Sequence, residues 1–170
     1  MTSQQVPFTN GIEIIKRLIR ADVAEKVNEL LAADRLARAA GKPAGVILVV
    51  NDDPLGFAAL PTPDSFTFFK GVEARNIGWE NEVTMRSVEL LRAYKADLAM
   101  EEISPTPLLM VVAENDTLTA TDLALKAYSR ALEPKELVMF KGGHFDAYSG
   151  EGLKKSLAKQ TEFLKRTLCA

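Results

Sequence analysis

The sequence lacks the features that mark several specialised classes of protein. Its single cysteine, Cys169, cannot form a disulfide within one chain. Its 21 Lys and Arg residues are balanced by 23 Asp and Glu residues, which leaves no basic excess to neutralise nucleic-acid phosphates. The longest apolar runs, residues 46–50 and 108–113, are too short to cross a bilayer. We therefore expect no nucleic-acid partner and no membrane association.

Several motifs of familiar chemistry are also missing. Residues 1–8 carry neither the basic segment nor the apolar core of a secretory signal, so we expect a cytoplasmic protein. The sequence has no Gly-rich phosphate loop and no dinucleotide-binding fingerprint. The one histidine has no second histidine or cysteine pair with which to hold zinc. We therefore expect no metal and no cofactor.

The composition itself fits one compact soluble domain. The chain has 170 residues, of which 47% are apolar, and a net charge of only −2, so it can bury a core and is not disordered. The first half predicts helices over residues 10–19 and 22–41 and a short strand within 45–51. A further helix is expected after Trp79, with Leu91 and Tyr94 on its buried side. We therefore expect a largely helical first half.

An aromatic stripe runs through the middle of the sequence. Its spacing is compatible with an apolar ligand pocket and equally with ordinary packing between helices. As a pocket it would favour an apolar or aromatic small-molecule substrate. The residues that we predict to line it are Phe57, Phe66, Phe69 and Trp79.

The second half has the pattern of a βαβα unit. Residues 108–113 form a continuous apolar run that is typical of a buried parallel strand, and residues 136–140 predict a second strand. Between them lies a helical segment for which Thr119 or Thr121 would be the N-cap. A final amphipathic helix follows residue 150. This order predicts a small parallel sheet with a right-handed crossover.

Two polar residues follow the two predicted strands. Asp116 comes just after the first strand, and His144, the only histidine, comes just after the second. Because parallel strands end at the same edge of a sheet, we expect the two side chains to lie close together, where Asp116 would orient the imidazole for acid–base chemistry. Glu114 is an alternative acid and Asp146 a weaker one. The same residues also suit ordinary loops, with Asp116 as a turn former.

The segment from residue 103 to 168 resembles the C-terminal end of α/β-hydrolases. The similarity is carried by residues 107–116 (PLLMVVAEND) and 141–148 (KGGHFDAY). In that fold the catalytic order is nucleophile, acid and then histidine, the last two following the last two strands. The resemblance therefore implies that Asp116 is the acid and His144 the histidine of such a site.

The first hundred residues resemble dienelactone-hydrolase-like and fungal polyketide-transferase-like members of the same family. Residues 5–8, 33–41 and 60–65 carry this similarity. There the region forms a helical cap, so the resemblance implies a truncated α/β-hydrolase fold: a helical cap-like region over 1–102, followed by the βαβα part of the core over 103–170. It also implies a secondary-metabolism enzyme acting on an acyl, ester or lactone substrate.

The nucleophile of that family is not found in the sequence. No Gly-x-Ser-x-Gly elbow is present, Ser149 follows the last predicted strand, and Cys169 has no base near it in sequence. The chain is also shorter than the ~250 residues of many single α/β domains. We therefore expect the nucleophile region and the oxyanion hole to be missing on the N-terminal side.

Three hypotheses follow from this deficit. In the first, the chain is an enzyme whose nucleophile comes from a complementing N-terminal chain, or an enzyme such as an isomerase or cyclase that needs only proton transfer. Alternatively, it is a non-catalytic remnant that serves as a binding or assembly module. Exposed sheet edges also invite pairing with another copy, so a homo-oligomer is a third expectation.

Overall fold

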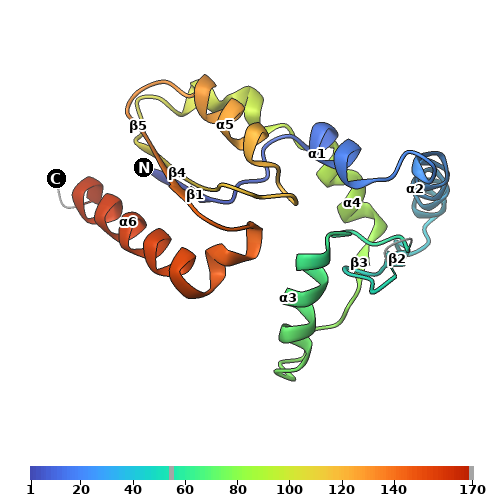
Figure 1. The fold of residues 1–170 in the computed structure, drawn as a ribbon. Coiled ribbons are helices and arrows are strands. Elements are labelled where there is room, and N and C mark those ends of the chain that lie inside the picture. Colours follow the sequence, from blue (N-terminus) through green and yellow to red (C-terminus); the bar gives the residue numbers. More distant parts are fainter. Residues whose placement is uncertain (54–55, 169–170) are drawn as a thin grey trace. The chain divides into compact units, whose positions relative to one another are not determined.

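The computed structural model describes residues 1–53 and 56–168. It divides into two compact units, which we describe separately (Figure 1). One unit contains the sheet and comprises residues 1–10 and 95–170; the other, residues 11–94, is mainly helical. The first ten residues thus belong with the second half of the sequence, because the chain leaves the sheet unit after its first strand and returns to it at Lys95.

The sheet unit is built on three parallel strands, β1 (Thr2–Gln5), β4 (Leu108–Ala113) and β5 (Lys135–Phe140), in the order β1-β4-β5. All six residues of β4 are buried, as the apolar run predicts for a central strand with both faces covered. The expected small parallel sheet is therefore present, with one strand more than the sequence analysis predicted.

Strand β1 was not expected, since the only strand predicted in the first half lay within residues 45–51. Its residues Thr-Ser-Gln-Gln show no apolar alternation, so nothing local predicts a strand there. The strand exists because it pairs in register with β4, Thr2 beside Leu108 and Gln5 beside Val111. Long-range pairing has overridden the weak local signal.

Helices cover both faces of this sheet, as Figure 1 shows. On one face, Leu109 and Val111 of β4 pack with Phe163 of α6 (Gly150–Leu168). On the other face, Leu108 and Met110 pack with α5 (Thr121–Arg130) and the 3-10 helix η1 (Ala96–Ile103). Since each fully buried aliphatic side chain contributes about 1.5–3 kcal/mol, the two faces of β4 hold the unit together.

The helical unit contains α1 (Gly11–Leu18), α2 (Ala24–Ala39), α3 (Pro63–Glu73) and α4 (Met85–Ala93). A two-stranded antiparallel ribbon joins β2 (Val46–Ile47) to β3 (Val83–Thr84). The core of the unit packs α2 against α4. Its buried members are Val27, Leu31, Met85 and Val88.

Two details of this unit differ from the sequence analysis. Leu91 and Tyr94 were expected to face inward, but Tyr94 is 49% exposed and Leu91 is exposed as well. The reason is that helix α4 ends at Ala93, so Tyr94 is already its C-cap.

Helix α1 packs closely against this end of α4. A Cβ on Gly11 would meet the carbonyl oxygen of Leu91 at 1.7 Å, so the position requires glycine.

A network of ion pairs ties α2 to α4 and to the segment before β2. Arg38 donates to Asp34 at 2.8 Å and contacts Glu89 at 2.5 Å, and Arg35 also donates to Glu89. The other oxygen of Asp34 accepts the backbone N–H of Gly45 at 2.7 Å. Asp34 is thereby buried with both carboxylate oxygens bonded.

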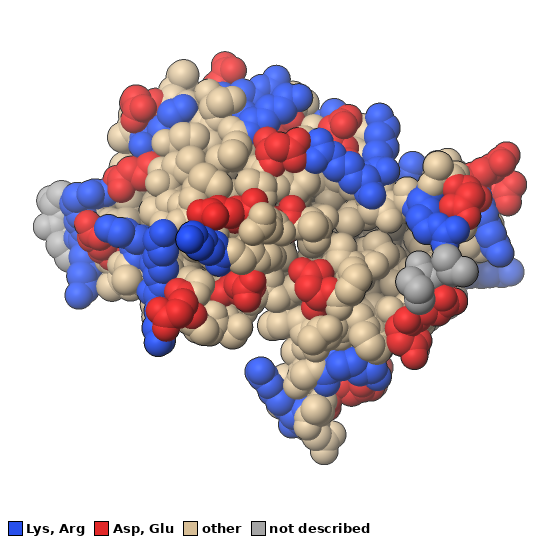
Figure 2. Space-filling model, in the orientation of Figure 1, with Lys and Arg blue, Asp and Glu red and all other residues tan. Residues whose placement is uncertain are grey.

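The charged side chains are mixed in sign over the visible surface. Figure 2 shows Lys and Arg interspersed with Asp and Glu, as a net charge of −2 leads one to expect. Among the described residues, no helix is long and apolar enough to cross a membrane.

Candidate active site

Asp116 and His144 lie where the sequence predicts them, just beyond the carboxyl ends of β4 and β5. The backbone pairing of these strands continues past their ends, because Glu114 N–H donates to the Phe140 carbonyl and Asn115 N–H to the Gly142 carbonyl. This extended ladder brings the loop after β4 beside the loop after β5. The Nδ1 atom of His144 lies 2.9 Å from Oδ2 of Asp116.

Every oxygen of the Asp116 carboxylate is engaged. Oδ1 accepts the backbone N–H groups of Leu118 at 2.9 Å and Thr119 at 2.7 Å. Oδ2 accepts the Thr119 hydroxyl at 2.8 Å in addition to His144. Asp116 is only 7% exposed and His144 9%, so water does not compete for these bonds. The pair is held in a fixed geometry.

The electrostatics of Asp116 favour its ionised form. Burial raises its pKa, but the hydrogen bonds from His144 and Thr119 outweigh burial, and the pKa lies below its usual value. An ionised carboxylate only accepts hydrogen bonds, so Nδ1 of His144 carries the proton that lies between them. In the neutral imidazole the lone pair is then on Nε2, which is the arrangement of a general base.

Backbone strain occurs at two places beside this pair. Val6, the residue after β1, has φ of 39°, and Ala120, four residues after Asp116, has φ of 34°. Positive φ is rare for residues other than glycine and is exceptional for a β-branched one. Both residues lie at the carboxyl edge of the sheet, and strain of this kind tends to accumulate at functional sites.

The loop that carries His144 depends on a glycine and on Asp146. Gly142 has φ of 126°, and a Cβ at this position would meet the Asp146 carboxylate at 2.4 Å. That carboxylate accepts the backbone N–H of Gly143 at 2.7 Å. Asp146 therefore shapes the turn and caps η2 (His144–Tyr148); it is exposed, and no contact with the imidazole ring is seen among the described residues.

A buried polar network supports the same loop from β1. The Gln5 amide donates to the Ala147 carbonyl at 3.2 Å, while its oxygen accepts Ser156 Oγ at 2.5 Å and Gln160 Nε2 at 2.7 Å. Ser156 is fully buried, so these bonds have no water to replace them. The network joins β1 and α6 to η2, the 3-10 helix that begins at His144.

Aromatic rings surround His144. The Phe145 ring lies edge-on at 4.9 Å between centroids, and the Tyr148 ring lies at 5.9 Å. Partial burial, together with the negative charge of Asp116, raises the pKa of Tyr148. Tyr148 remains 45% exposed, so its ring forms part of the surface beside the imidazole.

The other predicted residues of the sheet unit make no bond to this pair among the described residues. Glu114 is exposed, and no bond between it and His144 is found in the described part of the chain. Ser149 is exposed and directly precedes α6, and Cys169 lies outside the described residues. The predicted aromatic residues belong to the helical unit, where Phe69 stacks on Trp79 at 5.1 Å, Phe66 is half-buried in α3, and Phe57 packs against the core.

Sequence reasoning missed the role of Thr119 and the ring of Tyr148. Thr119 was expected as a helix cap, whereas its hydroxyl bonds Asp116. The signal for it was its position three residues after an aspartate, the spacing of a side chain that folds back on its own turn. Tyr148 ends the 3-10 helix that begins at His144, and because four residues exceed one turn of such a helix, the spacing gave no signal for this contact.

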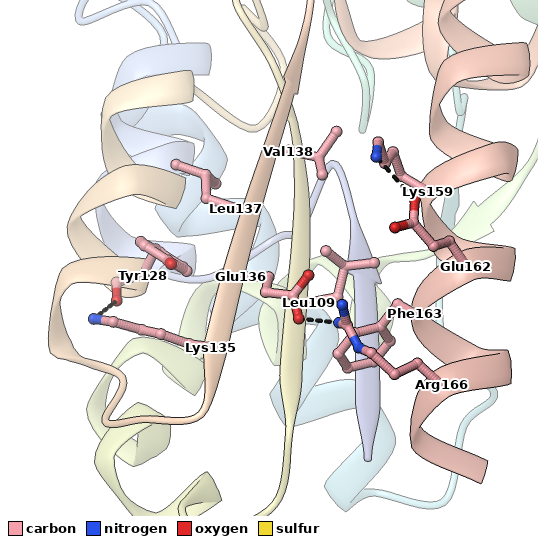
Figure 3. Close-up of a pocket in the computed structure, with 10 residues that line it drawn as sticks. All are labelled: Leu109, Tyr128, Lys135, Glu136, Leu137, Val138, Lys159, Glu162, Phe163 and Arg166. Carbon is pink, nitrogen blue, oxygen red and sulfur yellow. Dashed lines mark hydrogen bonds and ion pairs between the residues drawn. The ribbon is translucent and has the colours of Figure 1, made fainter. Parts of the chain in front are cut away.

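A hollow elsewhere in the sheet unit is not part of this site. Figure 3 shows it along the outer edge of β5, between α5 and α6, and its lining includes Lys135 at the opposite end of β5 from His144. Four of its charged side chains are paired, Arg166 with Glu136 and Lys159 with Glu162, while Lys135 Nζ donates to the Tyr128 carbonyl. Among the described residues, no group of three or more His, Cys, Asp or Glu side chains is arranged to hold a metal ion.

Comparison with known proteins places this geometry in a family. The chain matches no family model. It is 32% identical to polyketide transferase ATR5 of Stachybotrys chlorohalonatus, over 82% of this chain and 48% of the relative, and 32% identical to a polyketide transferase of Gibberella fujikuroi, over 85% and 44%. A thiohydrolase of Eupenicillium brefeldianum is 27% identical, over 85% and 48%. The chain thus spans about half the length of the curated relatives it matches.

The solved structures agree with the sequence relatives. The α/β-hydrolase GrgF from Penicillium matches with a TM-score of 0.73 and 27% identity, over 96% of this chain and 54% of that one. This chain has the α/β-hydrolase fold, and over about half of their length it is similar to the polyketide transferases. A second solved structure, DcsB in complex with its substrate analogue, matches with a TM-score of 0.75 at 20% identity and supports the fold alone.

The α/β-hydrolase fold gives the sheet a wider context. In this fold the acid and the histidine follow the last strands of the sheet in that order, as Asp116 follows β4 and His144 follows β5. The α/β-hydrolase fold class expected from the sequence is therefore confirmed.

Proposed function

We propose that this chain supplies the acid–base pair of an α/β-hydrolase-type enzyme acting on an acyl, ester or lactone substrate of polyketide type. The observation that carries the proposal is the 2.9 Å contact between His144 Nδ1 and Asp116 Oδ2 at the carboxyl edge of the sheet. The names of the relatives, polyketide transferases and a thiohydrolase, support the substrate class.

The proposed chemistry uses the free nitrogen of His144. Nε2 takes a proton from a hydroxyl, thiol or water nucleophile, and the resulting imidazolium is stabilised by the ionised Asp116. The same proton is then given to the leaving group. Within the sheet unit, no described residue hydrogen-bonds Nε2, so this nitrogen is available for such a transfer.

The nucleophile and oxyanion hole would come from outside the described residues. Among those residues of the sheet unit, no serine or cysteine side chain hydrogen-bonds the imidazole. We propose that an N-terminal segment or a complementing chain provides them. Proton-transfer chemistry such as isomerisation or cyclisation would need only the base and a substrate pocket.

The two edges of the sheet support completion at β1. Alternation along a parallel strand leaves the backbone groups of Ser3 and Gln5 in β1, and of Lys135, Leu137 and Met139 in β5, facing away from β4. In β5 two of these groups are bonded by side chains, since Lys135 N–H donates to Glu133 and the Met139 carbonyl accepts Lys155 Nζ.

No described residue of the sheet unit covers the corresponding groups of β1. An open edge of this kind pairs readily with another strand. The same edge would serve a second copy of the chain, which is how a homo-oligomer would form.

The second candidate is a non-catalytic remnant that binds a ligand or a partner. It is favoured by the lack of a serine or cysteine partner for His144 among the described residues of the sheet unit. In this case the Asp116–His144 pair would persist for its contribution to folding.

One experiment separates these functions. The purified chain is assayed with activated esters, thioesters and lactones, both alone and mixed with the separately produced N-terminal half of a fungal polyketide transferase. We expect turnover in the mixture that falls by about 100-fold or more in His144→Ala, the usual contribution of a general base. The exposed Glu114→Ala should retain full activity. Turnover unaffected by His144→Ala would refute the proposed role, and no turnover in any mixture would favour the remnant.

A further inference from the structure

We propose that Thr119 is a positioning residue whose hydroxyl fixes the Asp116 carboxylate and, through it, the imidazole of His144. This inference rests on the proposed acid–base function of the pair. Thr119 is 6% exposed, and its Oγ1 lies 2.8 Å from Asp116 Oδ2 and 3.3 Å from His144 Nδ1. Its side chain thus touches both members of the pair.

The direction of the hydroxyl proton follows from its neighbours. Nδ1–H of His144 already points at Asp116 Oδ2, and the ionised carboxylate only accepts. The Thr119 hydroxyl therefore donates, either to Asp116 Oδ2 at 2.8 Å or to the Val6 carbonyl at 3.4 Å. The shorter distance assigns the proton to Asp116.

The hydroxyl does something that the backbone bonds do not. The N–H groups of Leu118 and Thr119 bond only Oδ1. The Thr119 hydroxyl is a second donor to Oδ2, the oxygen that accepts from His144 Nδ1, and so it holds that oxygen directly. The backbone bonds would survive almost any substitution at position 119, whereas the hydroxyl bond needs threonine or serine.

The threonine hydroxyls around this loop are not used for helix capping. Helix α5 begins at Thr121, its N-cap is Ala120, and no side chain caps it. Thr121 instead donates to the Ala113 carbonyl at 2.7 Å and accepts the Asp116 N–H. The positive φ of Ala120, 34°, lies between the two threonines. The start of α5 is thus uncapped while both hydroxyls serve the Asp116 loop, which is unexpected for residues that only begin a helix.

The test uses the single histidine as a reporter. In protein labelled with ¹⁵N in its imidazole, we expect the neutral ring of the unmodified chain to carry its proton on Nδ1. In Thr119→Val a measurable share of the Nε2–H tautomer should appear, and Thr119→Ser should restore the original spectrum. Thr117→Val is the matched control. Thr117 is exposed in the same loop, and its side chain makes no hydrogen bond to another described residue. A Thr119→Val spectrum identical to that of the unmodified chain would overturn the proposal.

A second measurement keeps the test decisive if Thr119→Val does not fold. In the unmodified chain, the Thr119 hydroxyl proton should exchange slowly enough to split the Thr119 Cβ signal in mixed H₂O and D₂O. A single averaged signal would show that the hydroxyl is not held and would contradict the proposal.

Activity adds a readout if the chain or its mixture turns over substrate. Thr119→Val should then lower kcat by about tenfold with KM little changed, as for the loss of one hydrogen bond of ordinary strength, and Thr119→Ser should recover it. Unchanged kcat in Thr119→Val would overturn the positioning role. A failure of the proposed function would instead abolish turnover in every variant and leave the tautomer result intact.

Discussion

Two buried aspartates, one in each unit, have similar surroundings and different partners. Asp116 and Asp34 each accept a backbone N–H and each pair with a basic side chain. Both have a lowered pKa. The partner of Asp34 is Arg38, which keeps its charge at every ordinary pH, whereas the partner of Asp116 is His144, a residue type that exchanges its proton near neutrality.

This difference distinguishes a structural ion pair from a reactive one. The bond from Arg38 is the largest cause of the lowered pKa of Asp34, followed by that from Gly45, and neither can change its protonation. At Asp116, burial acts in the opposite direction and the bond from His144 overcomes it. Burial alone therefore does not identify a catalytic carboxylate; the chemistry of its partner does.

The largest effect should come from Asp116→Ala. This change leaves the N–H groups of Leu118 and Thr119 and the imidazole without their acceptor, which costs about 2–4 kcal/mol in the free energy of unfolding. The loss is measured by urea unfolding followed through the NMR signal of His144, the one histidine, which lies in the sheet unit. The exposed Glu114→Ala should change this free energy by less than about 0.5 kcal/mol. An equal loss in both variants would mean that Glu114 is as important as Asp116.

A smaller loss is expected for Asp34→Ala. Arg38 keeps Glu89 as a second partner, so only the N–H of Gly45 is left without its acceptor. The fluorescence of Trp79, the one tryptophan, reports on unfolding of the helical unit. Asp22→Ala, which removes an exposed pair with Arg20, serves as the control and should have almost no effect. The imidazole signals of His144 should be unchanged in both variants. A shift of these signals in Asp34→Ala would show that Asp34 affects the Asp116–His144 pair and would contradict its purely structural role.

The smallest effect is a dependence of stability on acid. A carboxylate with a lowered folded-state pKa stabilises the protein above its unfolded value of about 3.9 and loses that contribution as the pH falls through the folded-state value. The sheet unit should therefore lose stability below about pH 4, and Asp116→Asn should show a weaker loss over the same range. Urea unfolding at pH 7 and pH 3, followed through His144, measures the difference. An equal loss in both proteins would exclude Asp116 as its source.

The sequence predicted the elements that local patterns determine. The apolar run of β4 was assigned with its observed bounds, and β5 was placed one residue short at its start. The positions of Asp116 and His144 followed from the rule that parallel strands end at one edge. This rule alone was enough to predict that the two side chains lie close together.

What the sequence did not reveal depends on a strand partner distant along the chain and on backbone turns that the residue pattern does not indicate. β1 is polar, and only its pairing with β4 makes it a strand. Thr119 or Thr121 was expected to cap α5, but the N-cap is Ala120, whose positive φ is rare for this residue type and is not indicated by the sequence. The exposure of Tyr94 likewise depends on where α4 ends.

The most direct test of the acid–base pair is the tautomer of His144 in the unmodified chain. ¹⁵N spectra of the labelled imidazole are recorded while the pH is raised until the ring is neutral. We predict that the neutral ring carries its proton on Nδ1, bonded to Asp116, and leaves Nε2 free to accept one. A neutral ring protonated on Nε2 would leave no base facing a substrate and would contradict the proposed role of the pair.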